Sequence, residues 1–227
     1  MNRELAPEWL DVLPVDTPEA LDSRRDLQRL NAFLRHPTAV AKALVRSFPA
    51  APPRQIVELG AGDGSFMLRT CRLLARRWPK FHVILVDRLP AAGNELKRDF
   101  EALRWTMEFV SADVFDWLNH NAADAALANL FLHHLDRDAL GRLLQVLAAR
   151  TKVVIACEPY RAAVPLALSH LLGLAGANAV TRHDAPISVR AGFRRGELTA
   201  LWPKQGWKIE ETVFGFCSHL FAATGGS

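Results

Sequence analysis

A glycine-rich turn after a short apolar run constrains this chain more than any other part of its sequence. Residues 56–59 are apolar except for Glu58, and Gly60, Gly62 and Gly64 follow at alternate positions. Glycine adopts positive φ readily and has no Cβ, so a ligand can lie directly against the main chain. We therefore predict a buried strand, a tight turn and the start of a helix. A ligand would bind at the carboxyl end of that strand, as in open α/β sheets.

Strand and helix patterns alternate along the middle of the chain. Residues 81–87 and 152–158 are near-continuous apolar runs that end in an acid, which is typical of strands buried on both faces of a parallel sheet. The other expected strands are 56–59, a segment within 105–110, and 124–130. The expected helices are 66–78, 90–103 and 136–150. This alternation predicts a doubly wound, mostly parallel α/β sheet.

Both ends of the chain add elements to this sheet. Residues 1–20 hold three prolines and several acids, which predicts an extended or loosely folded arm. Helical patterns follow from Asp22 and around residues 39–45, and they fit either a cap on the sheet edge or a cover over the ligand site. A short helix at 197–202 precedes two closely spaced strands at 207–214 and 217–223.

Residues 162–180 carry no charged side chain, and their length approaches that of a membrane span. Pro165, His170 and Asn178 interrupt the apolar pattern, so we expect no membrane span here. A buried helix, a contact in a homodimer and a cover over a substrate pocket remain open. We expect residues 181–196, which are basic and rich in turn formers, to form a loop.

Composition narrows the function classes. Lys and Arg number 28 against 24 Asp and Glu, and the basic residues are dispersed rather than gathered in a stripe. A nucleic-acid partner is therefore not expected. Three widely separated cysteines give neither a disulfide framework nor zinc-ligand spacing, so we expect no metal. The polar, acidic N-terminus has no secretion signal, and we expect a cytoplasmic protein.

The spacing of the turn selects among ligands. The dinucleotide motif G-x-G-x-x-G would place its third glycine at Ser65, and the G-K-[ST] of a phosphate loop is absent. The order Glu58-x-Gly60-x-Gly62-x-Gly64 instead resembles motif I of the class I S-adenosylmethionine-dependent methyltransferases. The resemblance extends over residues 54–224, because Asp87, Asp113 and Asn129 follow at strand ends in the family's order.

This resemblance implies a seven-stranded sheet that ends in an antiparallel hairpin. It divides the chain into an N-terminal helical extension, residues 1–50, and a methyltransferase domain, residues 51–227, with an apolar cover insert at about 161–190. The implied cofactor is S-adenosylmethionine, with S-adenosylhomocysteine as product.

The resemblance also implies roles for the residues around the cofactor. Glu58 would orient the glycine loop by accepting backbone N–H groups, and Asp87 would accept the ribose hydroxyls. Asp113 would accept from the adenine amino group, with Asp116 as a rival, although both acids also suit the start of a short helix. The full expected set is Glu58, Gly60, Ala61, Gly62, Gly64, Asp87, Arg88, Ala112, Asp113, Val114, Asn129 and Leu130.

Residues 129–135 leave the fourth strand, where the methyl group must be presented. They lack the prolines that amino-methyltransferases of DNA bases carry there, and their Leu-His-His-Leu pattern resembles small-molecule C- and O-methyltransferases. His133 or His134 would take a proton from an acceptor hydroxyl, or both would be structural hydrogen-bonders. Arg161, Arg182 and His183 would either hold an acidic or carbonyl-bearing acceptor or anchor loops.

We therefore expect an enzyme that methylates a small, largely apolar acceptor, such as a phenolic, quinone-like or polyketide-like molecule. Alternatives are an RNA or protein methyltransferase and a non-catalytic partner subunit with the same fold. A dehydrogenase is a third alternative, which Ser65 weakens.

Overall fold

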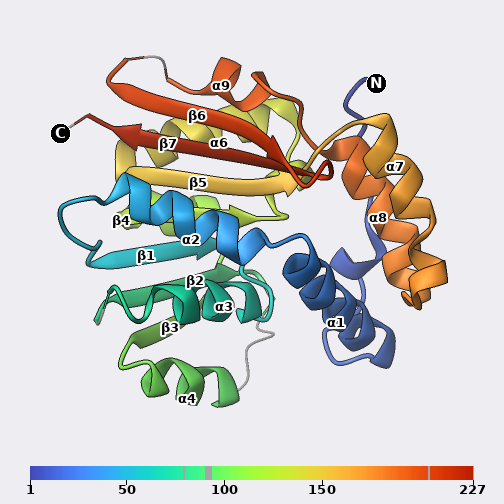
Figure 1. Cartoon of the computed structure of the whole chain (residues 1–227), viewed down its shortest axis with the longest axis horizontal. Coiled ribbons are helices and arrows are strands. Elements are labelled where there is room, and N and C mark those ends of the chain that lie inside the picture. Colours follow the sequence, from blue (N-terminus) through green and yellow to red (C-terminus); the bar gives the residue numbers. More distant parts are fainter. Residues whose placement is uncertain (79, 90–93, 204, 227) are drawn as a thin grey trace.

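The computed structural model describes residues 1–78, 80–89, 94–203 and 205–226. Helices cover both faces of one sheet (Figure 1). The described strands are β1 (Gln55–Leu59), β2 (His82–Asp87), β3 (Thr106–Ser111), β4 (Ala123–Asn129), β5 (Thr151–Pro159), β6 (Trp207–Phe214) and β7 (Ser218–Gly225). The described helices are α1 (Pro18–Phe33), α2 (His36–Ser47), α3 (Ser65–Leu74), α4 (Asn94–Ala102), α5 (Val114–His120), α6 (Arg137–Arg150), α7 (Ala163–His170), α8 (Ala179–Ala191) and α9 (Glu197–Leu201). Short 3-10 helices are η1 (Trp9–Asp11), η2 (Leu132–His134) and η3 (Leu172–Ala175).

The strand order is β3-β2-β1-β4-β5-β7-β6. Strands β1 to β5 are parallel, and β7 joins β5 and β6 in antiparallel pairs. This confirms the expected seven-stranded sheet with its C-terminal hairpin. The order reverses between β1 and β4, and ligands of open α/β sheets bind at such a switch point.

Alternation along β1 explains why the sheet is buried on both faces. Ile56 packs into a core with residues of α2, α3 and α4, whereas Val57 packs into a second core with residues of α5, α6 and α9. Successive side chains of a strand point to opposite faces, so an apolar run fills both cores. The apolar runs in the sequence therefore position the glycine turn rigidly at the sheet edge.

Two expected helix ends shift by four residues. Thr17 caps α1, so this helix begins at Pro18 rather than at Asp22. Helix α3 ends at Leu74, four residues before the expected end at Trp78. The expected helix 90–103 is seen as Asn94–Ala102, and residues 90–93 lie outside the described part.

The loop expected at 181–196 is wrong, because most of it forms α8. Asn178 caps this helix by accepting a hydrogen bond from Thr181 N, and the helix continues through Pro186. Val180, Thr181 and Val189 are buried. Helices α7 and α8 lie beside α1, beyond the carboxyl ends of the strands (Figure 1). None of the described helices is both long and apolar enough to cross a membrane.

The arm expected at residues 1–20 has no helix or strand over residues 1–8, but it forms η1 at Trp9–Asp11 and enters α1 at Pro18. It is also not loosely held. The Arg3 guanidinium donates to the carbonyl oxygens of Ala191 at 2.7 Å and Leu135 at 2.8 Å. The backbone N–H groups of Trp9 and Leu10 donate to the two carboxylate oxygens of Asp184. The arm is therefore tied to α8 and to the loop after β4.

Candidate active site

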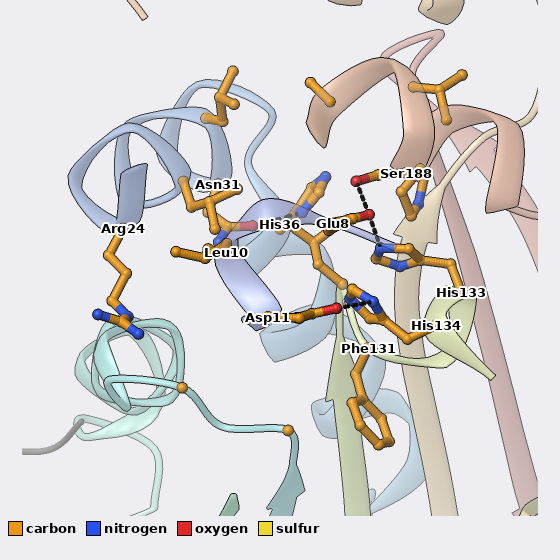
Figure 2. Close-up of a pocket in the computed structure, with 18 of the residues that line it drawn as sticks. Glu8, Leu10, Asp11, Arg24, Asn31, His36, Phe131, His133, His134 and Ser188 are labelled. Atoms are coloured by element: carbon orange, nitrogen blue, oxygen red, sulfur yellow. Dashed lines mark hydrogen bonds and ion pairs between the residues drawn. The ribbon is translucent and has the colours of Figure 1, made fainter. Parts of the chain in front are cut away.

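A cavity of about 830 Å³ opens at the switch point of the sheet. Its walls come from the turns after β1, β2, β3 and β4, the N-terminal arm, and helices α1, α7 and α8 (Figure 2). Seven of the expected cofactor residues line it: Gly60, Gly62, Asp87, Arg88, Asp113, Val114 and Leu130. Both candidate catalytic histidines, His133 and His134, line the same cavity.

The glycine turn and Asp87 form one end of the cavity. Asp87 Oδ2 accepts a hydrogen bond from Gly62 N at 2.8 Å, and its Oδ1 accepts from Leu89 N at 2.9 Å. Gly62 has a φ of +56°, and a Cβ added to it would meet no atom within 4 Å. Backbone and carboxylate are thus presented together to a ligand, with open space above Gly62.

Asp113 takes the helix-capping role that was one of its two expected roles. Its Oδ1 caps α5 by accepting from Phe115 N at 2.8 Å, and its Oδ2 lies 3.6 Å from Arg88 Nε. Asp113, Val114 and Phe115 all line the cavity. Asp113 therefore caps α5 with one carboxylate oxygen and presents the other to Arg88 at the cavity wall.

Within the described part of the chain, Glu58 accepts none of the backbone N–H groups that the resemblance implied. Its side chain is buried, and its Oε2 has no hydrogen-bond partner within the described residues. Burial, together with the charges of Asp63 and Asp87, raises the pKa of Glu58 well above its usual value. The turn is held instead by Asp87 and by Asp63, whose Oδ1 accepts from Ser65 N.

Four further expected residues support the turn without lining the cavity. A Cβ at Gly64 would lie 2.5 Å from Leu96 Cδ2, so this glycine allows close packing of α3 and α4 against β2. Ala61 N and Ala112 N complete the turns by donating to the carbonyl oxygens of Val86 and Asp87. Asn129 is the fourth, and it belongs to a buried polar network.

That network was not predicted, because its members are far apart in sequence. His36 Nδ1 lies 2.8 Å from Asn31 Oδ1 and 3.2 Å from Asn129 Oδ1, and its Nε2 lies 2.7 Å from Ser218 Oγ. Burial lowers the pKa of His36 to about 4, so its ring is neutral at physiological pH. Two amide oxygens at Nδ1 place the proton there, and Nε2 accepts from the serine hydroxyl. His36 and Asn31 line the cavity.

Glu158, near the end of β5, orients the ring of His133. The chain leaves β4 through Leu130, whose φ is +53°, and enters η2. His133 Nδ1 lies 2.7 Å from Glu158 Oε2, while Glu158 Oε1 accepts from Phe131 N and Leu132 N. Burial lowers the pKa of His133, but its contacts with Glu158 and Glu8 outweigh this and raise the pKa to about 9.

The N-terminal arm brings two acids to the histidines. Glu8 Oε1 lies 3.5 Å from His133 Nε2 and accepts from Ser188 Oγ at 2.6 Å. Asp11 Oδ2 lies 3.1 Å from His134 Nδ1 (Figure 2). Burial alone would raise the pKa of Glu8, but the contact with His133 has the larger effect and lowers the pKa below its usual value. The carboxylate is therefore ionised at neutral pH. The sequence pattern of the arm did not predict that either acid reaches the site.

The three expected substrate-binding residues do not line the cavity. Arg161 is buried, and its guanidinium donates to Met1 O, Gly192 O and Glu197 Oε1. His183 stacks on Trp9 with ring centroids 3.8 Å apart, and its Nδ1 contacts Asp184. Arg182 is exposed on α8. Arg161 and His183 therefore take the loop-anchoring role that was their alternative, and both fix the arm or the cover.

Apolar side chains form the remaining wall. They come from α1 and from the cover around α7, and they are Leu27, Leu30, Phe33, Leu34, Pro165, Leu168, Leu171 and Leu172. Phe33 is 81% exposed and Leu171 is 52% exposed, so this wall continues to the protein surface. The cavity thus has a polar end at the sheet and an apolar mouth.

Comparisons with known proteins agree with this architecture. Residues 56–153 match the family model described as a methyltransferase domain. No curated protein matches the chain in sequence. Among solved structures, an O-methyltransferase family protein from Burkholderia thailandensis aligns with a TM-score of 0.62 and 17% identity, covering 94% of this chain. This chain spans 64% of the length of that protein.

Two further structures have the same fold. The plantazolicin methyltransferase BpumL, in complex with a triazolic desmethylPZN analog and SAH, aligns with a TM-score of 0.67 and 11% identity over 92% of each chain. The pyocyanin biosynthetic protein PhzM aligns with a TM-score of 0.58 and 17% identity over 96% of this chain and 60% of that one. The chain therefore has the class I methyltransferase fold, and residues 56–153 within it match the methyltransferase domain model.

Proposed function

We propose that this protein transfers a methyl group from S-adenosylmethionine to a hydroxyl of a small, largely apolar acceptor. One observation carries the proposal. The Gly62–Asp87 turn, the His133–Glu158 pair and an apolar wall meet around a single cavity. A cofactor, a proton acceptor and an apolar substrate therefore have adjoining places.

The residues at the glycine end fit this cofactor. A carboxylate has about four lone-pair sites, and the backbone N–H groups of Gly62 and Leu89 occupy two of those of Asp87. The remaining sites suit the paired hydroxyls of a ribose. Asp113 Oδ2, with Val114 beside it, suits an adenine amino group and ring. When bound, the cofactor supplies an electrophilic methyl group on a sulfonium.

The rest of the cavity defines the acceptor class. Small-molecule sites enclose roughly 300–1,000 Å³, and about 830 Å³ lies near the top of that range. The apolar wall from α1 and α7 favours an aromatic or polyketide-like acceptor, and the exposed Phe33 at the mouth accommodates one that projects outward. The similarity to an O-methyltransferase family protein supports oxygen as the acceptor atom.

His133 is the proposed proton acceptor. Glu158 holds its Nδ1, and Nε2 is the ring atom that remains for the acceptor hydroxyl. Proton transfer to Nε2 forms an imidazolium between the carboxylates of Glu158 and Glu8. Because the pKa of His133 is raised to about 9, only its neutral form can take the proton, so turnover should rise as the pH is raised towards 9.

The test is the formation of S-adenosylhomocysteine with a panel of phenols, hydroxyquinones and aliphatic alcohols. We expect turnover with phenolic acceptors and a drop of about 10²–10⁴ in His133→Asn, the usual contribution of a general base. His120→Asn, an exposed histidine on α5 outside the cavity, is the matched control and keeps full turnover. Normal turnover in His133→Asn would refute the assigned base. Cofactor binding without turnover on any acceptor would instead favour the partner-subunit alternative.

A further inference from the structure

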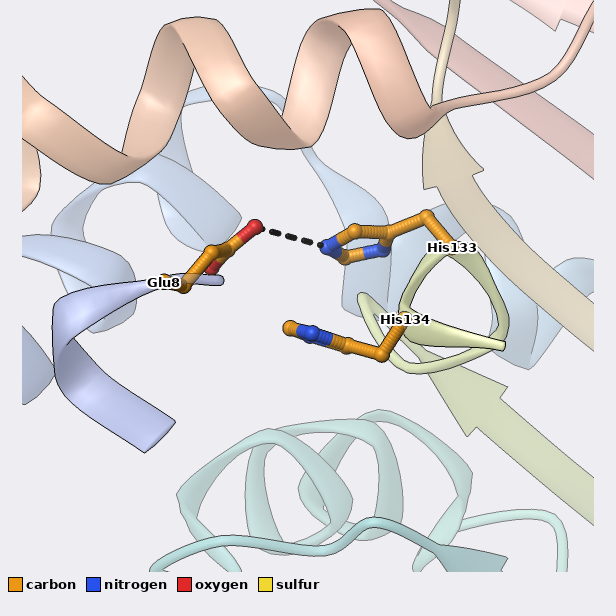
Figure 3. Close-up of side chains that lie close together, drawn as sticks. All are labelled: Glu8, His133 and His134. Carbon is orange, nitrogen blue, oxygen red and sulfur yellow. Dashed lines mark ion pairs between the residues drawn. The ribbon is translucent and has the colours of Figure 1, made fainter. Parts of the chain in front are cut away.

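Three metal-ligating side chains converge on the cavity wall. Glu8 comes from the arm, and His133 and His134 come from η2 (Figure 3). Each offers one donor atom, and the three donor atoms lie within 4.8 Å of one another. The ring centroids of the two histidines are 4.1 Å apart. Two imidazoles and one carboxylate are therefore gathered on one side of a shared space.

Each histidine also has a second carboxylate on its other nitrogen. Glu158 lies 2.7 Å from His133 Nδ1, and Asp11 lies 3.1 Å from His134 Nδ1. Metal-ligating histidines usually donate their second N–H to such a group, which fixes the tautomer and leaves Nε2 as the ligand atom. His133 has this arrangement through its hydrogen bond with Glu158, and at His134 the carboxylate of Asp11 lies at ion-pair distance from Nδ1.

The Nε2 atom of His133 supplies an independent observation. The side chain is 2% exposed, and this atom has no hydrogen-bond partner within the described residues. Its nearest charged neighbour, Glu8 Oε1, is 3.5 Å away, which is an ion-pair distance. A buried polar atom without a hydrogen-bond partner is uncommon and calls for a physical reason.

We propose that Glu8, His133 and His134 bind a divalent transition-metal ion, with Zn²⁺ as the best fit and one coordination position open to the cavity. Two histidines and one glutamate are a known ligand set of catalytic zinc, whereas Mg²⁺ and Ca²⁺ prefer oxygen ligands alone. The inference uses no cofactor, and it makes the ion and the proton of the proposed general base alternative occupants of His133 Nε2.

The local charges favour a cation at this point. The carboxylates of Glu8, Asp11 and Glu158 lie around the two imidazoles, so three acidic groups face the place of the proposed ion. Zinc bonds to nitrogen and oxygen are about 2.0–2.2 Å long, which requires the three donors to draw closer than they are without metal. Glu8 belongs to the arm, the element that can supply this movement. An ion bound at Nε2 would displace the proton from His133, and the open position would accept water or an acceptor hydroxyl oxygen.

The test is metal binding by the full-length chain after removal of any affinity tag and treatment with EDTA. We expect ZnCl₂ titration in a calorimeter to give one site per chain, and Co²⁺ to give the visible absorption of a low-coordinate nitrogen and oxygen site. Glu8→Gln and His134→Asn should each weaken Zn²⁺ binding at least tenfold. Glu8→Gln keeps the volume of the side chain and an acceptor for Ser188, so it preserves the fold.

Matched controls come from the same regions of the chain. Glu4→Gln removes an exposed acid of the arm, and His120→Asn removes an exposed histidine. Both should bind Zn²⁺ as the original chain does. Absence of a Zn²⁺ site in the original chain, or undiminished affinity in Glu8→Gln, would overturn the proposal. S-adenosylhomocysteine binding measured on the same samples reports the cofactor site separately, so failure of one proposal is distinguishable from failure of the other.

Discussion

Substitution of two neighbouring glycines by alanine separates ligand binding from packing in the glycine turn. Gly62 and Gly64 both have positive φ, +56° and +72°, so alanine meets similar backbone strain at each, about 1–2 kcal/mol. What the new Cβ meets differs. At Gly62 it meets no atom within 4 Å, and at Gly64 it lies 2.5 Å from Leu96 Cδ2 and 2.7 Å from Leu85 Cδ1.

The stability of the two variants should therefore differ. Overpacking in a core destabilises by about 1–3 kcal/mol, so Gly64→Ala should be less stable than Gly62→Ala by about that amount. For a chain of this size the difference corresponds to a melting temperature lower by about 2–4 °C per kcal/mol. Urea unfolding of both variants measures it. Gly196→Ala, with a φ of +87° and no atom within 4 Å of the new Cβ, reports the strain alone.

The affinity for S-adenosylhomocysteine should change in the opposite order. The Cβ of Gly62→Ala enters the space in which the ligand contacts the main chain, so we expect at least tenfold weaker binding, about 1.4 kcal/mol. Folded Gly64→Ala should bind much more tightly than Gly62→Ala, because its Cβ points into the core. Calorimetric titration at a temperature where both variants are folded gives both affinities. Full affinity in Gly62→Ala would show that the ligand does not lie against this turn.

Three further predictions follow from the site. Asp87→Ala should weaken cofactor binding by about 1–3 kcal/mol, whereas Asp136→Ala, which removes the cap of α6, should lower stability by about 1 kcal/mol and leave cofactor affinity unchanged in calorimetry. The pKa of His36 falls from 6.5 to about 4 on folding, so the unfolded chain takes up the proton first as the pH falls. The free energy of unfolding should therefore decrease by about 2 kcal/mol between pH 7 and pH 5, and this decrease should be missing in His36→Gln. Equal pH dependence of the two proteins would contradict the assignment. Glu158→Gln should lower turnover by a factor of about 10²–10⁴, because His133 loses the carboxylate that orients its ring. Glu211→Gln breaks the pair with His219 outside the cavity and should leave kcat unchanged.

Local patterns predicted the sheet and the glycine end of the site well. Ile56 and Val57 belong to an apolar run that fills cores on both faces, and such runs are visible without any tertiary information. Asp87 is the last residue of β2, so the sheet geometry alone places it beside Gly62. The pair His133–His134 was found because it leaves a strand at the same edge.

The remaining parts depend on contacts between distant segments. Glu8 and Asp11 reach the histidines only because Asp184 and Ala191 hold the arm, and no local pattern encodes those bonds. Arg161 follows β5 at the expected edge, but its guanidinium turns away to Gly192 and Glu197. Such side-chain directions are set by tertiary packing rather than by sequence spacing.

Calorimetric titration of the purified chain with S-adenosylmethionine, S-adenosylhomocysteine and NADH, side by side, tests the central claim most directly. The hydrogen bond between Asp87 and the glycine turn, and the third glycine at position 64 rather than 65, predict that both sulfur compounds bind at one site per chain. They also predict that NADH does not bind. Binding of NADH alone would contradict the methyltransferase function and return the chain to the dehydrogenases.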